Sequence, residues 1–175
     1  MNILVVGGGG REHAIAASLS KSPLTKRLVV APGNPGIETI AECYPVAADD
    51  IPGQCKLARD IEADFVFIGP EIPLVLGLKD ELLKLGISSF GPSKKAAQLE
   101  GSKTFSRNFC KRYNIPQPEF TYCTEIETAK KQIELLNGYC VVKADGLAAG
   151  KGVVVCDTVD QAIIAATEML EKNKF

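Results

Sequence analysis

The sequence predicts an α/β protein in which a doubly wound parallel sheet is followed by a smaller α+β lobe. Over the first 100 residues, short apolar runs alternate with helix-like segments, which is typical of a parallel sheet covered by helices on both faces. Near residue 100 this alternation ends, and two strand-like runs joined by a glycine-rich loop come later. We therefore expect a domain at residues 1–101, a helix and connector at 102–122, and a small lobe at 123–175.

The first domain begins with a strand, a glycine turn and a helix, the opening of a βαβ unit. The predicted strands cover residues 2–6, 28–31 and 65–68, and the predicted helices cover 11–20, 53–62 and 73–85. The last of these helices has leucines at helical spacing and is expected to end at Gly86.

In the second part, Ser102 is a predicted helix cap, and Phe105, Phe109 and Tyr113 follow at helical spacing. An extended connector at 115–118 and a strand at 120–123 should come next. Capping boxes at 124–127 and 158–161 are expected to open two more helices, with Leu136 among the inward residues of the first.

Composition excludes several functional classes. The chain has 20 Lys and Arg against 21 Asp and Glu, and no basic stripe with interleaved aromatic residues, so nucleic acid is not an expected partner. The first apolar run is too short for a signal peptide, and none reaches membrane-spanning length. We expect a soluble, cytoplasmic protein without a membrane partner.

Six cysteines raise the question of disulfides or metal binding. None forms a C-x-x-C pair, and His13 is the only histidine. We expect the cysteines to be reduced and mostly structural, and no metal site to be present in this stretch.

Residues 141–155 contain three glycines between two β-branched runs, with Lys143 and Lys151 at the two ends of the loop. Close-approaching peptide N–H groups and point positive charges suit a polyphosphate. The loop is one residue too short for the phosphate-binding loop of P-loop NTPases, and Gly152 replaces the Ser or Thr that binds magnesium there. A solvated turn is the alternative, although Lys143, if buried in an apolar strand, would need an anionic partner.

Three further features should meet at the carboxyl ends of parallel strands, where open sheets bind ligands. They are the tetraglycine with Arg11 and Glu12, the loop that contains Asn34, and Glu71. The glycine spacing does not fit G-x-G-x-x-G, which disfavours NAD. Arg11 is unfavourable at a helix amino end unless an anion binds there, although a solvated Arg11 beside a dipole-compensating Glu12 is an equal alternative.

Six stretches together resemble one enzyme family, and they are, in chain order, 6–14 (VGGGGREHA), 31–36 (APGNPG), 69–71 (GPE), 91–92 (GP), 98–103 (QLEGSK) and 142–153 (VKADGLAAGKGV). They are similar to the phosphoribosylamine–glycine ligases of the ATP-grasp superfamily, over essentially the whole chain. The resemblance implies a pre-ATP-grasp substrate domain at 1–101 and the start of an ATP-grasp fold after it. It also implies ATP- and Mg²⁺-dependent ligation of glycine to phosphoribosylamine through a glycyl phosphate, which yields glycinamide ribonucleotide, ADP and phosphate in purine synthesis.

Carried over residue by residue, the resemblance assigns two sets of binding residues. The phosphoribosylamine set is Gly9, Gly10, Arg11, Glu12, Asn34 and Glu71. The ATP set is Lys103, Lys143, Asp145, Gly146, Gly150, Lys151 and Gly152. No catalytic residue is assigned within the chain.

Since family members continue well past Phe175, the magnesium ligands are expected beyond that residue. We expect the chain to be an amino-terminal part, inactive alone and followed by or fused to the rest of the enzyme. The alternatives are another ATP-grasp carboxylate–amine ligase and a non-catalytic phosphosugar-binding module.

Overall fold

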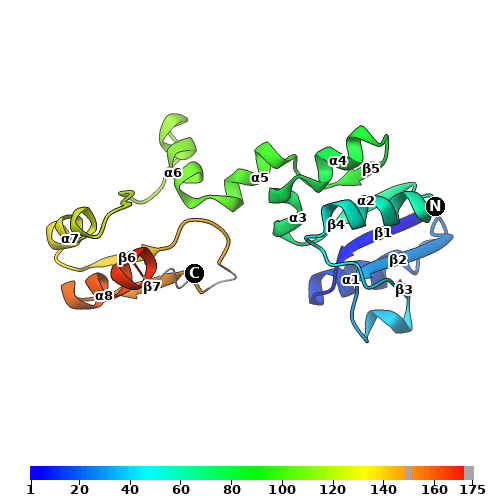
Figure 1. Ribbon diagram of the computed structural model, residues 1–175, viewed down its shortest axis with the longest axis horizontal. Coiled ribbons are helices and arrows are strands. Elements are labelled where there is room, and N and C mark those ends of the chain that lie inside the picture. The colour runs from blue at the N-terminus through cyan, green and yellow to red at the C-terminus, as the bar shows by residue number, and fades with distance from the viewer. Residues whose placement is uncertain (149–150, 172–175) are drawn as a thin grey trace. The chain divides into compact units, whose positions relative to one another are not determined.

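The computed structural model describes residues 1–148 and 151–171, and it divides into two compact units, Met1–Gly101 and Ser102–Phe175 (Figure 1). The first unit is an α/β domain, and the second is a small α+β lobe. In the part of the chain that is described, no helix is long and apolar enough to span a membrane.

The first unit contains a five-stranded, fully parallel sheet with the strand order β3-β2-β1-β4-β5. The strands are β1 (Asn2–Gly7), β2 (Arg27–Pro32), β3 (Glu42–Cys43), β4 (Phe65–Ile68) and β5 (Ser88–Phe90). The helices are α1 (Gly10–Leu19), the 3-10 turn η1 (Ile37–Thr39), α2 (Ile51–Asp60), α3 (Glu71–Leu76), α4 (Leu78–Lys84) and α5 (Lys94–Gly101). The chain adds β2 and β3 on one side of β1 and β4 and β5 on the other, so the predicted doubly wound sheet is confirmed.

Alternate residues of the central strands pack into two cores. Leu4 and Val6 of β1 lie in the core that contains α2 and α4, and Ile3 and Val5 lie in the core that contains α1. Because both faces of β1 are covered, its residues from Ile3 to Val6 are all apolar, as expected for a parallel strand. In such sheets ligands bind outside the carboxyl ends of the strands.

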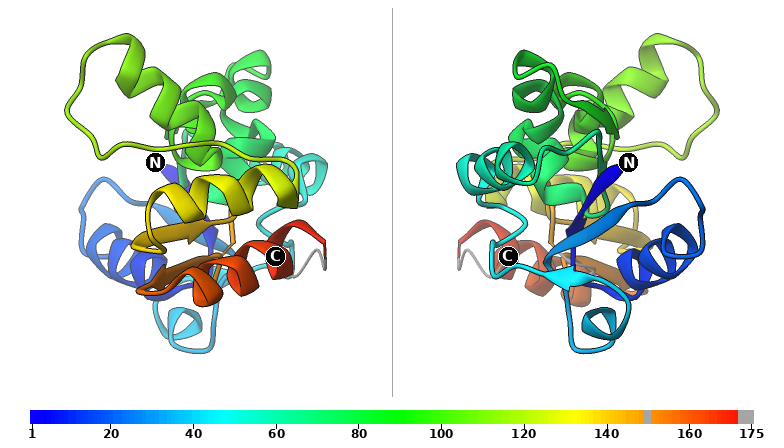
Figure 2. Two further views of the ribbon diagram at one scale, coloured as in Figure 1. Left: turned by 90° about the vertical axis from the view of Figure 1, so that its left-hand side faces the viewer. Right: turned by 90° about the vertical axis from the view of Figure 1, so that its right-hand side faces the viewer.

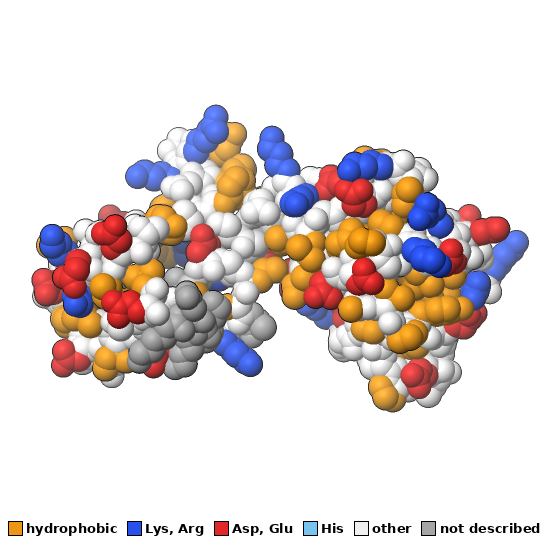
Figure 3. Space-filling model, viewed as in Figure 1, with side chains coloured by type: hydrophobic (Ala, Val, Ile, Leu, Met, Phe, Trp, Pro, Cys, Tyr) orange, Lys and Arg blue, Asp and Glu red, His pale blue; other side chains and the backbone are white. Residues whose placement is uncertain are grey.

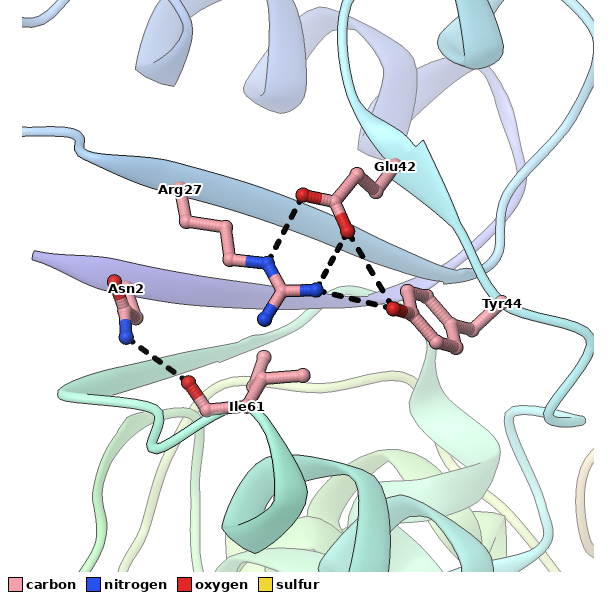
Figure 4. Close-up of polar contacts among 5 residues, drawn as sticks. All are labelled: Asn2, Arg27, Glu42, Tyr44 and Ile61. Carbon is pink, nitrogen blue, oxygen red and sulfur yellow. Dashed lines mark hydrogen bonds and ion pairs between the residues drawn. The ribbon is translucent and has the colours of Figure 1, made fainter.

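The amino end of the sheet is held by side-chain hydrogen bonds. Arg27 at the start of β2 donates from Nε and Nη2 to the Glu42 carboxylate at 2.9 and 2.6 Å, and from Nη2 to the Tyr44 hydroxyl at 3.0 Å (Figure 4). Asn2 Nδ2 donates to the carbonyl of Ile61 at 3.0 Å. The contacts join β1, β2, the short edge strand β3 and the end of α2.

The first unit differs from the sequence prediction in two ways. The helix predicted at 73–85 is two helices, because Gly77 has φ +102° and ends α3 in a left-handed conformation before α4 begins. Four short elements were also not predicted, namely the 3-10 turn η1, the strands β3 and β5 and the helix α5. A two-residue edge strand has no detectable period, and tertiary pairing with β2 creates it.

The second unit consists of α6 (Lys103–Arg112), α7 (Ile126–Leu135), the antiparallel hairpin β6 (Cys140–Lys143) and β7 (Val153–Cys156), and α8 (Val159–Leu170). Figure 2 shows α7 and α8 beside the hairpin in the left-hand view. Their shared core includes Ala129, Ile133, Cys156 and Ala162. As predicted, Ser102 caps α6 by accepting from the Phe105 amide at 3.1 Å.

Several predictions in this unit are wrong. Residues 120–123 form no strand, because no neighbouring strand pairs with them in the described chain. The capping box at 124–127 is also absent, since Glu125 is the N-cap of α7 and makes no side-chain cap. Leu136 lies just past the end of α7 and is 52% exposed rather than inward.

The predicted capping box at 158–161 is confirmed for one of its two hydrogen bonds. Thr158 caps α8, but the Gln161 side chain accepts from the Asp157 amide instead of that of Thr158.

Charges on the surface are mixed. Figure 3 shows Lys and Arg interspersed with Asp and Glu over the visible face of each unit, with hydrophobic side chains between them. This distribution matches the formal net charge of −1. All six cysteines lie in the described ranges, and none is bonded to another there. That they are reduced in solution stays a prediction.

Candidate functional site

In the first unit, the carboxyl ends of β1, β2 and β4 bring three loops together. The tetraglycine follows β1, the loop with Asn34 follows β2, and Glu71 comes three residues after β4. The backbones are in close contact, because Gly33 N–H donates to Gly7 O at 3.1 Å and a Cβ on Gly8 would overlap Gly33 O. The sequence prediction that these features share one edge of the sheet follows directly from the parallel topology.

Asn34 fixes the geometry of this junction. Its Nδ2 donates to the Gly8 carbonyl at 2.9 Å, while its Oδ1 accepts from the amides of Gly36 and Ile37 at 2.9 and 3.0 Å. All three bonds are to backbone groups, so in the described structure Asn34 positions the tetraglycine rather than presenting a free amide. A glycine at position 36 leaves room for the His13 ring, whose Cε1 would lie 2.7 Å from an added Cβ.

Glu12 is the most unusual residue of the site. It is only 4% exposed, and its Oε2 accepts from the Gly9 amide at 2.7 Å at the start of α1. Its Oε1 is buried against Gly69 and accepts no hydrogen bond from the described protein. A buried carboxylate oxygen without a donor is unfavourable, so this oxygen retains the capacity to accept from a hydroxyl or amine.

The amino end of α1 remains open beside Glu12. No described side chain accepts from the amides of Gly10 and Arg11, and a Cβ on Gly10 would have no neighbour within 4 Å. Helix amino ends with free N–H groups favour anions such as phosphate. The tetraglycine therefore presents peptide donors in space that a bound group could enter.

Arg11 extends from this helix end to Glu71, and Nη2 lies 3.0 Å from Oε1. The pKa of Glu71 lies below its ordinary value because its own backbone N–H and then the Arg11 guanidinium hydrogen-bond to the carboxylate. The pair is largely solvent-exposed, so it contributes little to stability. The anion predicted beside Arg11 is thus, in the free chain, a carboxylate of the chain itself.

A cleft of about 380 Å³ adjoins the Arg11–Glu71 pair, and its other lining residues are Leu74, Val75, Pro92, Ala97 and Glu100. Sequence reasoning assigned no role to these five. Glu100 and Pro92 lie in the stretches that carry the family resemblance, which was the only available signal for them. The cleft has a volume suited to a small polar ligand.

In the second unit, Asp145 joins the hairpin loop to the start of α6. Its Oδ1 accepts from the amides of Lys103, Thr104 and Gly146 at 2.6, 3.2 and 2.9 Å, and Ser102 Oγ donates to Oδ2 at 3.1 Å. Burial acts to raise the pKa of Asp145, but the hydrogen bonds from Thr104, Gly146 and Ser102 outweigh it and lower the pKa. Negative charge at a helix amino end is favourable, and it offsets the unfavourable position of Lys103.

Lys103 completes this connection, because its Nζ donates to the carbonyl of Gly146 at 2.7 Å. Gly146 has φ +89°, a conformation that favours glycine. Three residues of the predicted ATP set, Lys103, Asp145 and Gly146, are therefore in direct contact across more than forty positions of sequence.

The remaining members of that set are less constrained. Lys143 is exposed on the hairpin face opposite α7 and α8, so the premise that it is buried in an apolar strand is wrong. The alternating strand places it beside the exposed Val141, Val153 and Val155. Its ammonium makes no hydrogen bond or ion pair with the described residues and is free to bind an anion.

Lys151 is exposed, and its amide donates to Ala148 O at 2.8 Å. Gly152 is buried, and a Cβ there would lie 2.8 Å from that of Ala148, which explains the glycine. The predicted ATP residue Gly150 lies outside the described residues. Within 1–148 and 151–171, no group of three or more His, Cys, Asp or Glu could hold a metal ion, so we assign magnesium no step here.

Comparison with known proteins places both units in one family. Residues 1–100 match the phosphoribosylglycinamide synthetase N domain, and residues 101–175 match the ATP-grasp (A) domain of the same enzyme. The chain is 46% identical over 177 residues to a phosphoribosylamine–glycine ligase of Haemophilus influenzae, an alignment that covers the whole chain and 41% of that protein. It is 48% identical over 170 residues to the ligase of Caulobacter vibrioides, which covers 97% of the chain and 40% of that protein.

A solved structure agrees with these sequence matches. The crystal structure of phosphoribosylamine–glycine ligase from Thermotoga maritima superimposes with a TM-score of 0.77 at 27% identity, over 98% of the chain and 40% of that protein. The chain thus spans about two fifths of the length of the relatives it matches. With family matches over both units, the chain belongs to the phosphoribosylglycinamide synthetase family, and it corresponds to the N domain and an amino-terminal stretch of the ATP-grasp domain.

Proposed function

We propose that this chain supplies the phosphoribosylamine site and the phosphate-covering hairpin of a ligase that joins glycine to 5-phosphoribosylamine. ATP would activate the glycine carboxylate as glycyl phosphate, and the amine of phosphoribosylamine would then displace the phosphate to give glycinamide ribonucleotide. The single observation that carries this assignment is the unpartnered, buried Oε1 of Glu12 next to the open amino end of α1.

The first unit offers complementary groups for a phosphorylated sugar. The free amides of the α1 start and the Arg11 guanidinium suit a phosphate, and Glu12 Oε1 and Glu71 suit hydroxyl or amine donors. Arg11 would exchange its contact with Glu71 for the more highly charged phosphate. Asn34 would act by holding the tetraglycine in place through its three backbone bonds.

The second unit offers groups for a nucleotide triphosphate. Lys143 and Lys151 are exposed cations on the hairpin, and Lys103 lies at its base. We propose that Asp145 holds the loop against α6, while Gly146, Gly150 and Gly152 allow the backbone to approach the phosphates. We propose further that the complete enzyme binds Mg²⁺ and glycine. We also propose that it is located in the cytoplasm.

Calorimetric titration of the 175-residue chain with ribose 5-phosphate tests the first half. We expect binding, and Arg11→Ala should weaken it by roughly 10- to 100-fold, because a charge-assisted hydrogen bond contributes about 1.5–3 kcal/mol. Arg59→Ala is the matched control, since Arg59 is an exposed arginine in the last turn of α2, away from the site. Equal effects of both substitutions would contradict the assignment of the site.

The complete polypeptide tests the second half. We expect it to release ADP only when glycine and phosphoribosylamine are both present. ADP release with bicarbonate or formate in place of glycine would indicate a different ATP-grasp ligase, and sugar phosphate binding without any ADP release would indicate a binding module.

A further inference from the structure

Two of the six free cysteines are direct partners in the hairpin of the second unit. Cys140 at the start of β6 is paired in register with Cys156 at the end of β7. Residues directly opposite each other in an antiparallel ladder project from the same face of the sheet. Both side chains belong to the core formed with α7 and α8, so the two thiols share one environment.

The hydrogen-bond pattern defines the distance between the two backbones. Ala144 N–H donates to Gly152 O at 2.9 Å, which makes positions 144 and 152 a hydrogen-bonded pair. Such pairs recur at every second position, so Cys140 and Cys156 are also a hydrogen-bonded pair. Their Cα atoms are therefore about 5.5 Å apart, within the range of about 4.4–6.8 Å that disulfides span.

No other two cysteines of the described chain are opposed in this way. Cys43 and Cys55 pack on opposite faces of the parallel sheet, and Cys110 lies on α6. Cys123 packs against the same core as the hairpin pair, but it lies in a segment without a strand partner. It is the only competitor within that core.

We propose that Cys140 and Cys156 form a reversible disulfide that closes the base of the β6–β7 hairpin. The oxidant is a small-molecule disulfide such as oxidised glutathione. The half-buried Cys140 is the accessible thiol, and Cys156, which is 2% exposed, is the resolving one.

The reaction proceeds in two exchanges. The Cys140 thiolate attacks one sulfur of glutathione disulfide, that S–S bond breaks, and the first glutathione leaves as a thiolate. Cys156 then loses its proton to solvent and attacks the Cys140 sulfur, which releases the second glutathione. Two protein thiols are oxidised to one disulfide, and one glutathione disulfide is reduced to two thiols.

The raised pKa of the Cys140 thiol makes the rate of its oxidation depend on pH. Burial, and secondly the neighbouring Cys156, raise the pKa of the Cys140 thiol. The thiolate is the attacking species, so the rate of oxidation should rise as the pH increases toward that pKa. The product encloses residues 141–155, which include Lys143, Asp145 and Gly152, in a covalent ring.

The test is to incubate the folded 175-residue chain with oxidised glutathione and then alkylate it in denaturant. We expect the mass to show four alkylated thiols and the loss of two hydrogens, and peptide mapping to find the 140–156 cross-link as the dominant species. The same treatment in urea is the control, and there the cross-links should be distributed over many pairs. A cross-link to Cys123, no cross-link in the folded chain, or the same distribution with and without urea would overturn the proposal.

Two variants check the order of events. Cys156→Ser should stop at the mixed disulfide, with one glutathione attached to Cys140, while Cys110→Ser should form the cross-link as the unsubstituted chain does. Circular dichroism establishes whether each variant is folded. If a variant is unfolded, the peptide map of the unsubstituted chain still decides which cysteines are paired. Glutathione attached to Cys123 rather than Cys140 in Cys156→Ser would count against the assigned attacking thiol.

Discussion

Removal of the Asp145 carboxylate should destabilise the second unit, because this side chain joins the hairpin loop to the start of α6. In Asp145→Ala, the amides of Lys103, Thr104 and Gly146 and the Ser102 hydroxyl lose their common acceptor. Loss of a helix cap costs about 0.5–2 kcal/mol. Since the site is partly open to water, which replaces some of these bonds, we expect a loss of about 1–2 kcal/mol rather than the sum of four bonds.

Urea unfolding followed by tyrosine fluorescence measures this change selectively. Three of the four tyrosines, Tyr113, Tyr122 and Tyr139, lie in the second unit, and the chain has no tryptophan. If the free energy of unfolding falls by about 1 kcal/mol per M of urea, the urea concentration at the midpoint of unfolding should fall by roughly 1–2 M in Asp145→Ala. Asp145→Asn, which keeps one acceptor oxygen, should lie between Asp145→Ala and the unsubstituted chain.

The pH dependence provides an independent check. Burial acts to raise the pKa of Asp145, but the hydrogen bonds to its carboxylate hold that pKa below its ordinary value in the folded chain. The stabilisation is therefore fully present above the unfolded-state pKa of about 3.9, and it is lost as the pH falls through the lower folded-state value. The difference between the unsubstituted chain and Asp145→Ala should narrow below about pH 4.

Asp157→Ala is the matched control, because Asp157 is an exposed aspartate of the same unit whose carboxylate makes no hydrogen bond or ion pair in the described structure. Its midpoint should stay close to that of the unsubstituted chain. Equal midpoints for Asp145→Ala and Asp157→Ala at pH 7 would refute the role assigned to Asp145.

Three further outcomes are expected. Gly8→Ala should destabilise the first unit by about 1–3 kcal/mol in urea unfolding, because its Cβ would overlap Gly33 O, whereas Gly10→Ala has open space and should be nearly neutral. In the complete enzyme, Lys143→Ala should raise the KM for ATP by roughly 10- to 100-fold. Glu71→Gln should weaken the binding of phosphoribosylamine and leave the KM for ATP unchanged. If both variants weakened the binding of the same substrate, the two-site proposal would be contradicted. Alkylation of the unfolded chain, without reductant or prior oxidant, should label six thiols by mass, and any protected thiol would contradict a fully reduced resting chain.

Sequence alone determined the features that depend on near neighbours in the chain. The apolar run before the tetraglycine and the helical pattern after it predicted the opening βαβ unit. Ser102 and Thr158 were identified as helix caps because a cap is bonded three residues away. Parallel topology then predicted that the tetraglycine, Asn34 and Glu71 would share one edge of the sheet.

Only the tertiary structure decided which groups neutralise the unfavourable cations. Arg11 and Lys103 both lie in the first turn of a helix, where a positive charge is unfavourable. The chain supplies Glu71 beside Arg11 and Asp145 at the start of α6 beside Lys103, 60 and 42 positions away in sequence. Local pattern contains no information about such partners, because they are set by how the strands and loops pack.

The same reason explains the errors. Residues 120–123 have strand-like composition but form no strand without a partner, while Glu42 and Cys43 form one because β2 lies beside them. Lys143 is in a strand, as predicted, but which face of that strand is buried depends on where α7 and α8 pack. Periodicity determines that the faces of a strand alternate, and the packing of distant helices decides which of them meets water.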